Sequence, residues 1–544
     1  MTSLAIRGTR SSGEDVRSAA VTACVAVANV LRSGLGPSGL DTMLVDELGD
    51  VTVTNDGSTI VALLDVSHPA ARVLVDVAGR QDAEVGDGTA SVVILAAELL
   101  HRANALVAAK IHPTNIIAGY RLAMREACKY IRDKMVTPID KLGREVLVNA
   151  ARTSLSSKVL GSAESARFAS MAVDAVQAVK VGGGKDGVPA SYPIKAVHVI
   201  KCRGQSARES ELLPGVALNG GRAALGMPTR VSPARVACLD VDLRRTKMRT
   251  GIHIQVADAA ALAVAQDKEL DITRDRVRAI LASGANVVVT TKGIDDAALK
   301  YFVAAGAIAL RRVPLADVKR VAKATGAVLQ GSLADLSSSE SLDASALGMA
   351  EEAAERRVRD DTITLLRGCR STAACSVLLR GPNAAMCDEA ARAFHDATCV
   401  VKRALESGTV VPGGGAVEAA LSVYLDNFAT MLGSREQLAI AAFAESLLVI
   451  PKTLAVNTGL DATELIARLR AVHHVAQTRE GKAGLAHVGL DLTRGGVCNS
   501  SRAGVVEPAL SKIKAIQFAA EAAVTILRID DEVILARQDT NPEG

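Results

Sequence analysis

A stretch near the middle of the chain alternates short apolar segments of strand character with segments of helical composition. The strand-like segments cover residues 285–291, 307–313 and 327–330, and the helical segments between them cover residues 295–305 and 317–324. Strands that alternate with helices are joined by crossover connections, so the pattern predicts a parallel α/β sheet. An all-helical or purely antiparallel fold is therefore excluded for this part of the chain.

The segments on both sides of this α/β region are mainly helical. Apolar residues recur at helical spacing in residues 18–32, 91–109, 115–132, 416–424, 434–448, 462–475 and 511–529. A charged segment, residues 257–281, predicts a further helix that projects over one edge of the sheet. Because 544 residues are too many for one core, we expect several domains.

Composition narrows the classes of function. The 63 Lys and Arg residues nearly balance the 59 Asp and Glu residues, and no basic tract stands out, which argues against nucleic-acid binding. The chain has five Tyr, six Phe and no Trp, so base-stacking surfaces and aromatic-lined pockets are not expected. The core must instead be built from Ala, Val, Leu and Ile.

Cysteines and the N-terminus indicate the compartment. None of the nine cysteines has CxxC spacing, which argues against zinc ribbons and a disulfide framework and favours a reducing environment. The N-terminus is charged where a signal peptide needs apolar residues, and the longest uncharged run, residues 18–31, is too short to span a bilayer. We therefore expect a cytoplasmic protein that does not enter a membrane.

The pair His473–His474 is expected on a helix surface.

A glycine-rich loop follows the first predicted helix. Residues 34–39, GLGPSG, match GxGxxG, but a dinucleotide-binding fold requires a strand before this motif and a helix after it. A glycine C-cap followed by a turn explains Gly34 without any ligand. A phosphate-binding role becomes attractive because other loops of similar chemistry occur in the chain.

Two of those loops place a carboxylate between small residues ahead of a predicted helix. They carry Asp56, in NDGST, and Asp87, in GDGTAS. Backbone N–H groups at a helix N-terminus favour anions, so an aspartate there is explained if a cation joins it to a phosphate. Mg²⁺ suits this role, since it binds one or two carboxylates together with phosphate oxygens. For either loop alone, an Asx-type turn at a helix cap remains the alternative.

A third loop contains three consecutive glycines, Gly413 to Gly415, and runs into a predicted helix. Such a run permits close approach of the backbone to a ligand, and a purine or ribose could lie there. The chain has no GxxxxGK[ST] sequence, so a P-loop is excluded.

In combination, four segments resemble the group II chaperonins closely and in the order of that family. They are LGPSGLDTMLVDELGDVTVTNDGSTI, AEVGDGTASVVILAAELL, VVPGGGAVEAAL and AGVVEPALSKIKAIQFAAEAAVTILRIDD. The resemblance runs nearly from end to end. Residues 68–93, 152–162 and 396–441 look most like the eukaryotic cytosolic branch of the family.

This resemblance implies a multidomain α and α/β fold. A mostly helical equatorial domain would take residues 1–147 and 402–544, a small intermediate domain residues 148–213 and 371–401, and an α/β apical domain with a helical protrusion residues 214–370. It implies an ATP-driven folding machine with ATP or ADP and Mg²⁺ as cofactors. The partners would be paralogous subunits in an eight-membered double ring and unfolded cytosolic polypeptides, including actin- and tubulin-like clients.

The family's functional residues carry over by motif. The implied nucleotide-binding residues are Leu35, Gly36, Pro37, Gly39, Asp87, Gly88, Thr89, Ala90, Ser91, Ser157, Lys158, Gly414, Gly415 and Glu507. Asp87 would bind Mg²⁺, and Lys158 would sense the terminal phosphate. Asp396 would polarise the attacking water and Asp56 would help to place it. Glu507 would accept hydrogen bonds from ribose hydroxyls.

Three departures weaken the motifs without removing these carboxylates. Ala90 replaces a threonine usual in the family, Asn499 stands where many members carry aspartate, and Thr42 stands where lysine is common. We still expect hydrolysis. Two other classes of protein remain open, a small-molecule kinase or ATPase with a polar substrate pocket and a ring scaffold that hydrolyses little ATP.

Overall fold

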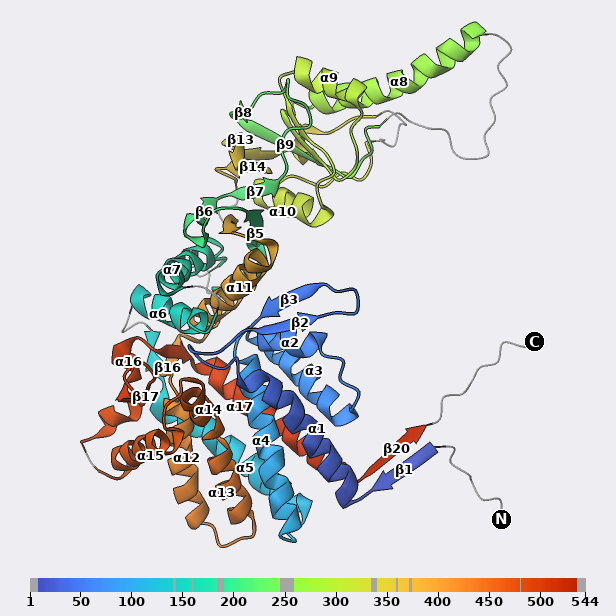
Figure 1. Ribbon diagram of the computed structural model, residues 1–544. Coiled ribbons are helices and arrows are strands. Elements are labelled where there is room, and N and C mark those ends of the chain that lie inside the picture. Colours follow the sequence, from blue (N-terminus) through green and yellow to red (C-terminus); the bar gives the residue numbers. More distant parts are fainter. Residues whose placement is uncertain are drawn as a thin grey trace, which may run out of the picture. The chain divides into compact units, whose positions relative to one another are not determined.

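The computed structural model describes residues 8–139, 143–158, 161–182, 190–244, 259–333, 340–358, 361–370, 374–479 and 481–535. The chain forms two compact units, of which unit 1 comprises residues 1–173 and 392–544 and unit 2 residues 174–391 (Figure 1). Both crossings between the units fall inside the segments predicted to form the intermediate domain. The division into three domains itself stays a prediction.

Unit 1 is mainly helical, as the apolar spacing predicts. Its N-terminal part contains α1 (Glu14–Arg32), α2 (Gly57–Leu63), α3 (Pro69–Glu84), α4 (Thr89–Ala108), α5 (Pro113–Tyr130), α6 (Arg144–Leu155) and most of α7 (Ser162–Ala178). Its C-terminal part contains most of α11 (Ala384–Ser407), then α12 (Ala416–Thr430), α13 (Glu436–Ser446), α14 (Val449–Asn457), α15 (Ala462–Thr478), α16 (Ser500–Ala503) and α17 (Ala509–Leu527). The two sequence-distant parts therefore build one domain.

Helices α4 and α17 form the centre of this unit, packed against each other (Figure 1). Ten residues of α4 and twelve of α17 are buried, most of them Ala, Val, Leu or Ile, as the composition predicts. A helix that is apolar on nearly all sides must be covered by neighbours.

Two segments of unit 1 pass a length and composition test for membrane spans that tolerates a few charged residues, unlike the search for uncharged runs. They are α4 and Glu436–Asn457, which covers α13 and α14. Counting uncharged runs missed them because Glu98 and Glu445 interrupt them. Their apolar windows are 50% and 61% buried inside the protein, which is typical of core helices.

Short antiparallel sheets of unit 1 position the loops between its helices. Strands β2 (Thr42–Val45) and β3 (Val51–Thr54) form a hairpin, and β16 (Thr409–Pro412) lies between β19 (Val506–Pro508) and β4 (Thr137–Pro138). Two further pairs are β17 (Val488–Asp491) with β18 (Gly496–Asn499) and β1 (Gly8–Ser12) with β20 (Asp531–Leu535). Strand β3 leads into Asp56, and β16 leads into the triple glycine.

Unit 2 contains the α/β region in a four-stranded sheet of order β11-β10-β9-β12. Strands β9 (Ala234–Leu239), β10 (Val287–Thr290) and β11 (Ile308–Leu310) are parallel, whereas β12 (Gly348–Ala350) is antiparallel to β9. The sheet predicted to be parallel is therefore mixed. Residues 327–330, predicted as its third strand, contribute only a bridge between Leu239 and Gln330.

Along the chain, the other elements of unit 2 come before, between and after the strands of this sheet. Helices α9 (Asp296–Ala304) and α10 (Leu315–Thr325) connect its strands, and α8 (Ala259–Ala282) confirms the helix predicted at residues 257–281. A three-stranded sheet contains β5 (Val197–Arg203), β6 (Glu211–Pro214) and β15 (Cys375–Gly381). A four-stranded sheet contains β7 (Val216–Asn219), β8 (Arg230–Val231), β13 (Glu352–Val358) and β14 (Asp361–Arg367).

Two side-chain expectations have clear outcomes. All nine cysteines are free thiols, as predicted. His473, expected on a helix surface, is instead fully buried, and its Nε2 lies 2.9 Å from the Val488 carbonyl oxygen. The prediction was wrong because this face of α15 packs against β17, which the sequence pattern did not reveal.

Candidate functional site

Asp56 follows β3 directly and caps the N-terminus of α2. Its Oδ2 accepts hydrogen bonds from Ser58 Oγ (2.7 Å), Thr59 Oγ1 (2.6 Å) and the Thr59 backbone N–H (3.1 Å). This is helix-cap chemistry, the alternative considered from the sequence. Its other oxygen, Oδ1, lies 4.0 Å from Lys158 Nζ. Burial alone would raise the pKa of Asp56, but Lys158 and the hydrogen bonds outweigh burial and lower it.

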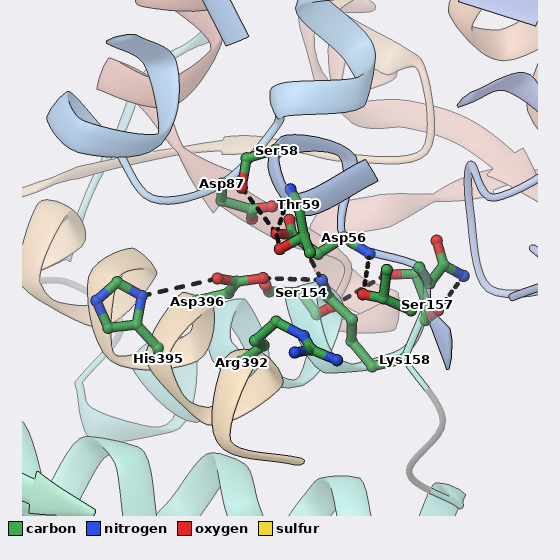
Figure 2. Close-up of polar contacts among 12 residues, drawn as sticks. Asp56, Ser58, Thr59, Asp87, Ser154, Ser157, Lys158, Arg392, His395 and Asp396 are labelled. Atoms are coloured by element: carbon green, nitrogen blue, oxygen red, sulfur yellow. Dashed lines mark hydrogen bonds and ion pairs between the residues drawn. The ribbon is translucent and has the colours of Figure 1, made fainter. Parts of the chain in front are cut away.

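Lys158 joins Asp56 to a carboxylate from the other half of the sequence. Its Nζ lies 2.8 Å from Oδ2 of Asp396, which is on α11 (Figure 2). The Lys158 and Asp396 side chains are only 7% and 9% exposed. An unpaired charge is costly in such surroundings, so the ion pair fixes both side chains in place.

His395 borders the same carboxylate. Its Nδ1 lies 3.9 Å from Asp396 Oδ1, on the opposite side of Asp396 from Lys158 (Figure 2). Contacts with Asp396 and then Cys399 raise the pKa of His395 to about 10, and burial opposes this shift. Lys158 is therefore the close positive partner of Asp396, and His395 is a more distant group whose side chain is 57% exposed.

Asp87 lies on the turn between α3 and α4. Gly86 and Gly88 on either side of it have φ of 77° and 76°, a left-handed conformation that favours glycine. The Gly88 N–H donates to Asp87 Oδ1 (2.7 Å), and Gln81 Nε2 donates to the Asp87 backbone oxygen (2.9 Å). Burial, followed by the like charge of Asp396, raises the pKa of Asp87 to about 6.

The donor set around Asp87 fits Mg²⁺. Within the described ranges no donor reaches its Oδ2 oxygen, and a cation there would offset the repulsion from Asp396. The described residues contain no group of three His, Cys, Asp or Glu side chains poised to hold a metal. Mg²⁺ needs none, because one or two carboxylates suffice when phosphate oxygens and water complete its coordination.

Close packing makes the Asp56 and Asp87 loops neighbours. A Cβ on Gly57 would lie 2.8 Å from the Ala90 nitrogen and 2.9 Å from Thr89 Oγ1, so glycine at this position permits the contact. Thr89, Ala90 and Ser91 form the first turn of α4. Arg392, one turn before Asp396 on α11, donates to the Val53 backbone oxygen at 3.4 Å.

The triple glycine lies directly against Glu507. Gly414 and Gly415 have φ of 68° and 76°, and Gly415 caps α12. A Cβ on Gly413 would lie 2.9 Å from Glu507 Oε1, so the carboxylate uses space that only glycine leaves. The charge of Glu507 also contributes to the raised pKa of Asp87, after burial and Asp396.

Lys512 is a charged neighbour of this site that the motifs did not reveal. It lies on α17, with Nζ 2.7 Å from Glu418 Oε1 and 2.9 Å from Glu507 Oε2. Burial alone would lower the pKa of Lys512, but the two carboxylates raise it above its ordinary value. No sequence spacing links α12, β19 and α17, so only the fold shows this triad.

The loop of residues 34–39 follows α1 and precedes β2, an order that excludes the dinucleotide-binding fold. Its left-handed glycine is Gly36 (φ 92°) rather than Gly34, which corrects the expected glycine C-cap. A Cβ on Gly36 would overlap Leu454 of α14. Asn457, at the end of α14, donates to the Arg32 and Leu35 backbone oxygens, both at 2.8 Å.

The three departures from the family motifs have local explanations. Asn499 accepts a hydrogen bond from the Arg502 N–H (3.1 Å) and caps α16. The Ala90 backbone lies directly against Gly57, and Thr42 is the first residue of β2. None of them replaces a charged group of the cluster around Asp396.

No role was predicted from the sequence for two further neighbours, Asn55, the first residue of NDGST, and Asp82. Asn55 donates from Nδ2 to the Ser157 backbone oxygen at 2.9 Å. Asp82, on α3, has its pKa raised by burial, then by Asp56 and Asp396, so it belongs to the same acidic group. The only sequence signal was proximity: Asn55 directly precedes Asp56, and Asp82 lies near the end of α3, five residues before Asp87.

The arrangement has the chemistry needed to bind phosphate groups and polarise a water molecule. Unit 1 contains buried carboxylates, a buried ammonium group paired with them, and glycine turns at helix N-termini.

Comparison with known proteins gives consistent matches. The TCP-1/cpn60 chaperonin family matches residues 27–538. The T-complex protein 1 subunit alpha of Arabidopsis thaliana is 57% identical over 99% of this chain and 98% of its own length. The subunit of the same name from Dictyostelium discoideum is 50% identical, over 98% and 96%. The thermosome subunit alpha of Aeropyrum pernix is 40% identical, over 96% and 92%. The resemblance inferred from the motifs is therefore confirmed.

Proposed function

The chain belongs to the TCP-1/cpn60 chaperonin family, and we propose that it is a group II chaperonin subunit that couples ATP hydrolysis to the folding of polypeptides. The names of its relatives, T-complex protein 1 and thermosome subunits, support this reading. The main structural support for ATP hydrolysis is the position of the Lys158 ammonium group between Asp396 and Asp56.

The nucleotide would lie among the glycine turns of unit 1. Phosphates would lie against the N-terminus of α4, where free backbone N–H groups attract anions. The contacts would come from Leu35, Gly36, Pro37, Gly39, Gly88, Thr89, Ala90, Ser91 and Ser157 for the phosphates, and from Gly414, Gly415 and Glu507 for the nucleoside. Asp87 would hold Mg²⁺, which when bound supplies positive charge to the phosphate oxygens.

Hydrolysis would use the three charged groups that meet at Lys158. A water oxygen would attack the γ-phosphorus, and the bond from that phosphorus to the β–γ bridging oxygen would break, releasing ADP and phosphate. Asp396 would take the proton of the water, and Asp56 would help to orient it. Lys158 would offset the charge of the terminal phosphate, because its ammonium is a compact charge on a flexible stem.

The same residues would link the nucleotide to the rest of the chain. Lys158 lies shortly before one crossing between the units and Asp396 shortly after the other. Contacts of ATP with both would favour one arrangement of these segments, and loss of the γ-phosphate would end that preference.

We further propose the family's assembly for this chain. Residues 1–147 with 402–544, 148–213 with 371–401, and 214–370 would be the equatorial, intermediate and apical domains, with α8 in the lid. Paralogous subunits would complete an eight-membered double ring in the cytoplasm, and unfolded polypeptides, including actin- and tubulin-like ones, would be its clients. Neither nucleic acid nor a membrane would be a partner.

The deciding experiment images the assembled particle that contains this chain and measures its ATP hydrolysis. We expect double rings, and we expect Asp396→Asn to preserve nucleotide binding while removing this subunit's share of hydrolysis. Asp388→Asn is the matched control, since Asp388 lies on the same helix and pairs with Lys201 (2.6 Å). A small oligomer that phosphorylates a small molecule would support the kinase reading. Rings whose hydrolysis is unchanged by Asp396→Asn would support the scaffold reading.

A further inference from the structure

We propose that Asn55 is a positioning residue that holds Lys158 beside Asp56 and Asp396, so that recognition of a terminal phosphate by Lys158 depends on the Asn55 side-chain amide. The inference rests on the proposed nucleotide site and deepens it. Asn55 follows β3 and directly precedes Asp56, yet its side chain forms a hydrogen bond with a different segment of the chain, the turn after α6.

The contact between Asn55 and that segment is partly buried, with the Asn55 side chain on its more buried side. Asn55 is only 8% exposed, and its Nδ2 donates to the backbone oxygen of Ser157 at 2.9 Å. A buried carbonyl or amide without a partner is costly, so both groups favour keeping this hydrogen bond. The bond therefore fixes the main chain at the residue immediately before Lys158.

The amide of Asn55 occupies the place that a side chain at residue 34 would take. A Cβ on Gly34 would lie 2.7 Å from Asn55 Oδ1 and 3.4 Å from its Cγ. The side chain thus fills space that exists because residue 34 is glycine. Asn55 lies next to the start of the loop at residues 34–39 and hydrogen-bonds to the turn that carries Lys158.

Lys158 needs such an anchor because it lies beyond the end of a helix. Helix α6 ends at Leu155, and the Lys158 N–H donates to the Leu155 carbonyl at 3.1 Å in the turn that follows. Its side chain has four flexible carbons, yet it must place Nζ 2.8 Å from Asp396 and 4.0 Å from Asp56. Fixing the backbone next to it lowers the entropy lost when the ammonium group takes that place. Asn55 therefore acts through Lys158.

The test measures how well the full-length chain distinguishes a slowly hydrolysed ATP analogue from ADP, as the ratio of the two dissociation constants. Asn55→Asp has nearly the same shape, but its carboxylate cannot donate to the Ser157 carbonyl. We expect the preference for the triphosphate to fall by about tenfold, the effect of losing one well-placed hydrogen bond near a charge. Asn55→Ala removes the amide without adding charge and should have the same direction of effect.

The matched control is Asn286→Asp in unit 2. Asn286 also donates its amide to a backbone carbonyl, that of Pro233, at 2.7 Å. This variant should leave the triphosphate preference unchanged. If it lowers the preference as much as Asn55→Asp does, the loss is a general effect of weakened structure and the proposal is overturned.

A double-mutant cycle separates positioning from simple stabilisation. In a chain that already carries Lys158→Ala, Asn55→Asp should change the triphosphate preference by less than about twofold, because the residue it positions is gone. An equal loss in both backgrounds, or no loss for Asn55→Asp and Asn55→Ala, overturns the role of Asn55. If the wild-type chain binds neither nucleotide, the proposed function fails first and this inference fails with it.

Discussion

Lys158 and Asp396 form a buried ion pair, with Nζ 2.8 Å from Oδ2, although they belong to opposite halves of the sequence. Asp56 Oδ1 lies 4.0 Å from the same ammonium group. One lysine thus partly neutralises the two carboxylates that would act on water. A terminal phosphate would compete with them for Lys158, and this competition would leave Asp396 free to accept a proton.

The ion pair predicts how the site responds to loss of one partner. Lys158→Met should destabilise unit 1 by about 3 kcal/mol, because it leaves Asp396 buried without its partner cation. The measurement is the thermal unfolding midpoint of the full-length chain. Lys158→Met combined with Asp396→Asn removes the orphaned charge and should recover most of the midpoint. A double variant no more stable than Lys158→Met would show that the unpaired charge of Asp396 is not the cause of the lost stability.

Replacing Asp87 should change ATP affinity differently in the presence and in the absence of Mg²⁺. Asp87→Asn should weaken ATP binding by about tenfold or more when Mg²⁺ is present, since one of few protein ligands is lost. With Mg²⁺ chelated, binding should be equal or tighter, because a negative charge near the phosphates is gone. Isothermal titration in both conditions gives the comparison. Asp76→Asn, an exposed carboxylate on α3, is the control, and an Asp87→Asn effect independent of Mg²⁺ would argue against the metal role.

His473 predicts the acid sensitivity of the C-terminal half of unit 1. Burial lowers the pKa of His473 to about 4, below its ordinary value of 6.5. The unfolded chain therefore binds more protons than the folded chain between these values, so this histidine makes stability fall as the pH drops from about 6.5 to about 4. The full effect is of order 3 kcal/mol.

His473→Gln should reduce that acid sensitivity while keeping a donor for the Val488 carbonyl. The quantity to compare is the change in unfolding midpoint between about pH 7 and about pH 5 in the variant and in the wild type. The loss of midpoint should be smaller in the variant. Equal losses in the two proteins would mean that other groups, such as His487, whose pKa burial also lowers, dominate the acid response.

The sequence predicts best those parts of the site that depend on local backbone chemistry. The turns at Gly86–Gly88 and Gly414–Gly415 require left-handed residues ahead of a helix, and both helices begin where the motifs indicate. The contact of Asp56 with Lys158 could be expected only from family resemblance, because residues far apart in sequence have no common period.

Interactions that depend on tertiary packing escaped prediction. Lys512 meets Glu507 because β19 pairs with β16 and α17 starts directly after β19. Residues 327–330 have strand composition yet form one bridge, since the edge of the sheet beside β9 is taken by β12. Asn55 carries no charge, and the motif NDGST points to its neighbour Asp56, so the contact of Asn55 with Ser157 becomes visible only in the folded chain.

Gly39 predicts the strongest structural constraint in the loop at residues 34–39. A Cβ on Gly39 would overlap the backbone oxygen of Gly34, which cannot swing away as a flexible side chain can. Gly39→Ala should therefore distort the loop, lower the unfolding midpoint and weaken ATP binding several-fold, with a stability cost of about 1–3 kcal/mol.

Gly79→Ala is the matched comparison for Gly39→Ala. Gly79 lies within α3, and a Cβ there meets nothing within 4 Å. The same chemical change should stabilise the protein by about 0.5–1 kcal/mol, because alanine loses less backbone entropy in a helix. Both substitutions restrict the unfolded chain to a similar degree, so the difference between their unfolding midpoints reports the clash at Gly34. A Gly39→Ala variant as stable as Gly79→Ala would show that the loop has room to rearrange, and the tight packing against Gly34 would then not explain the glycine.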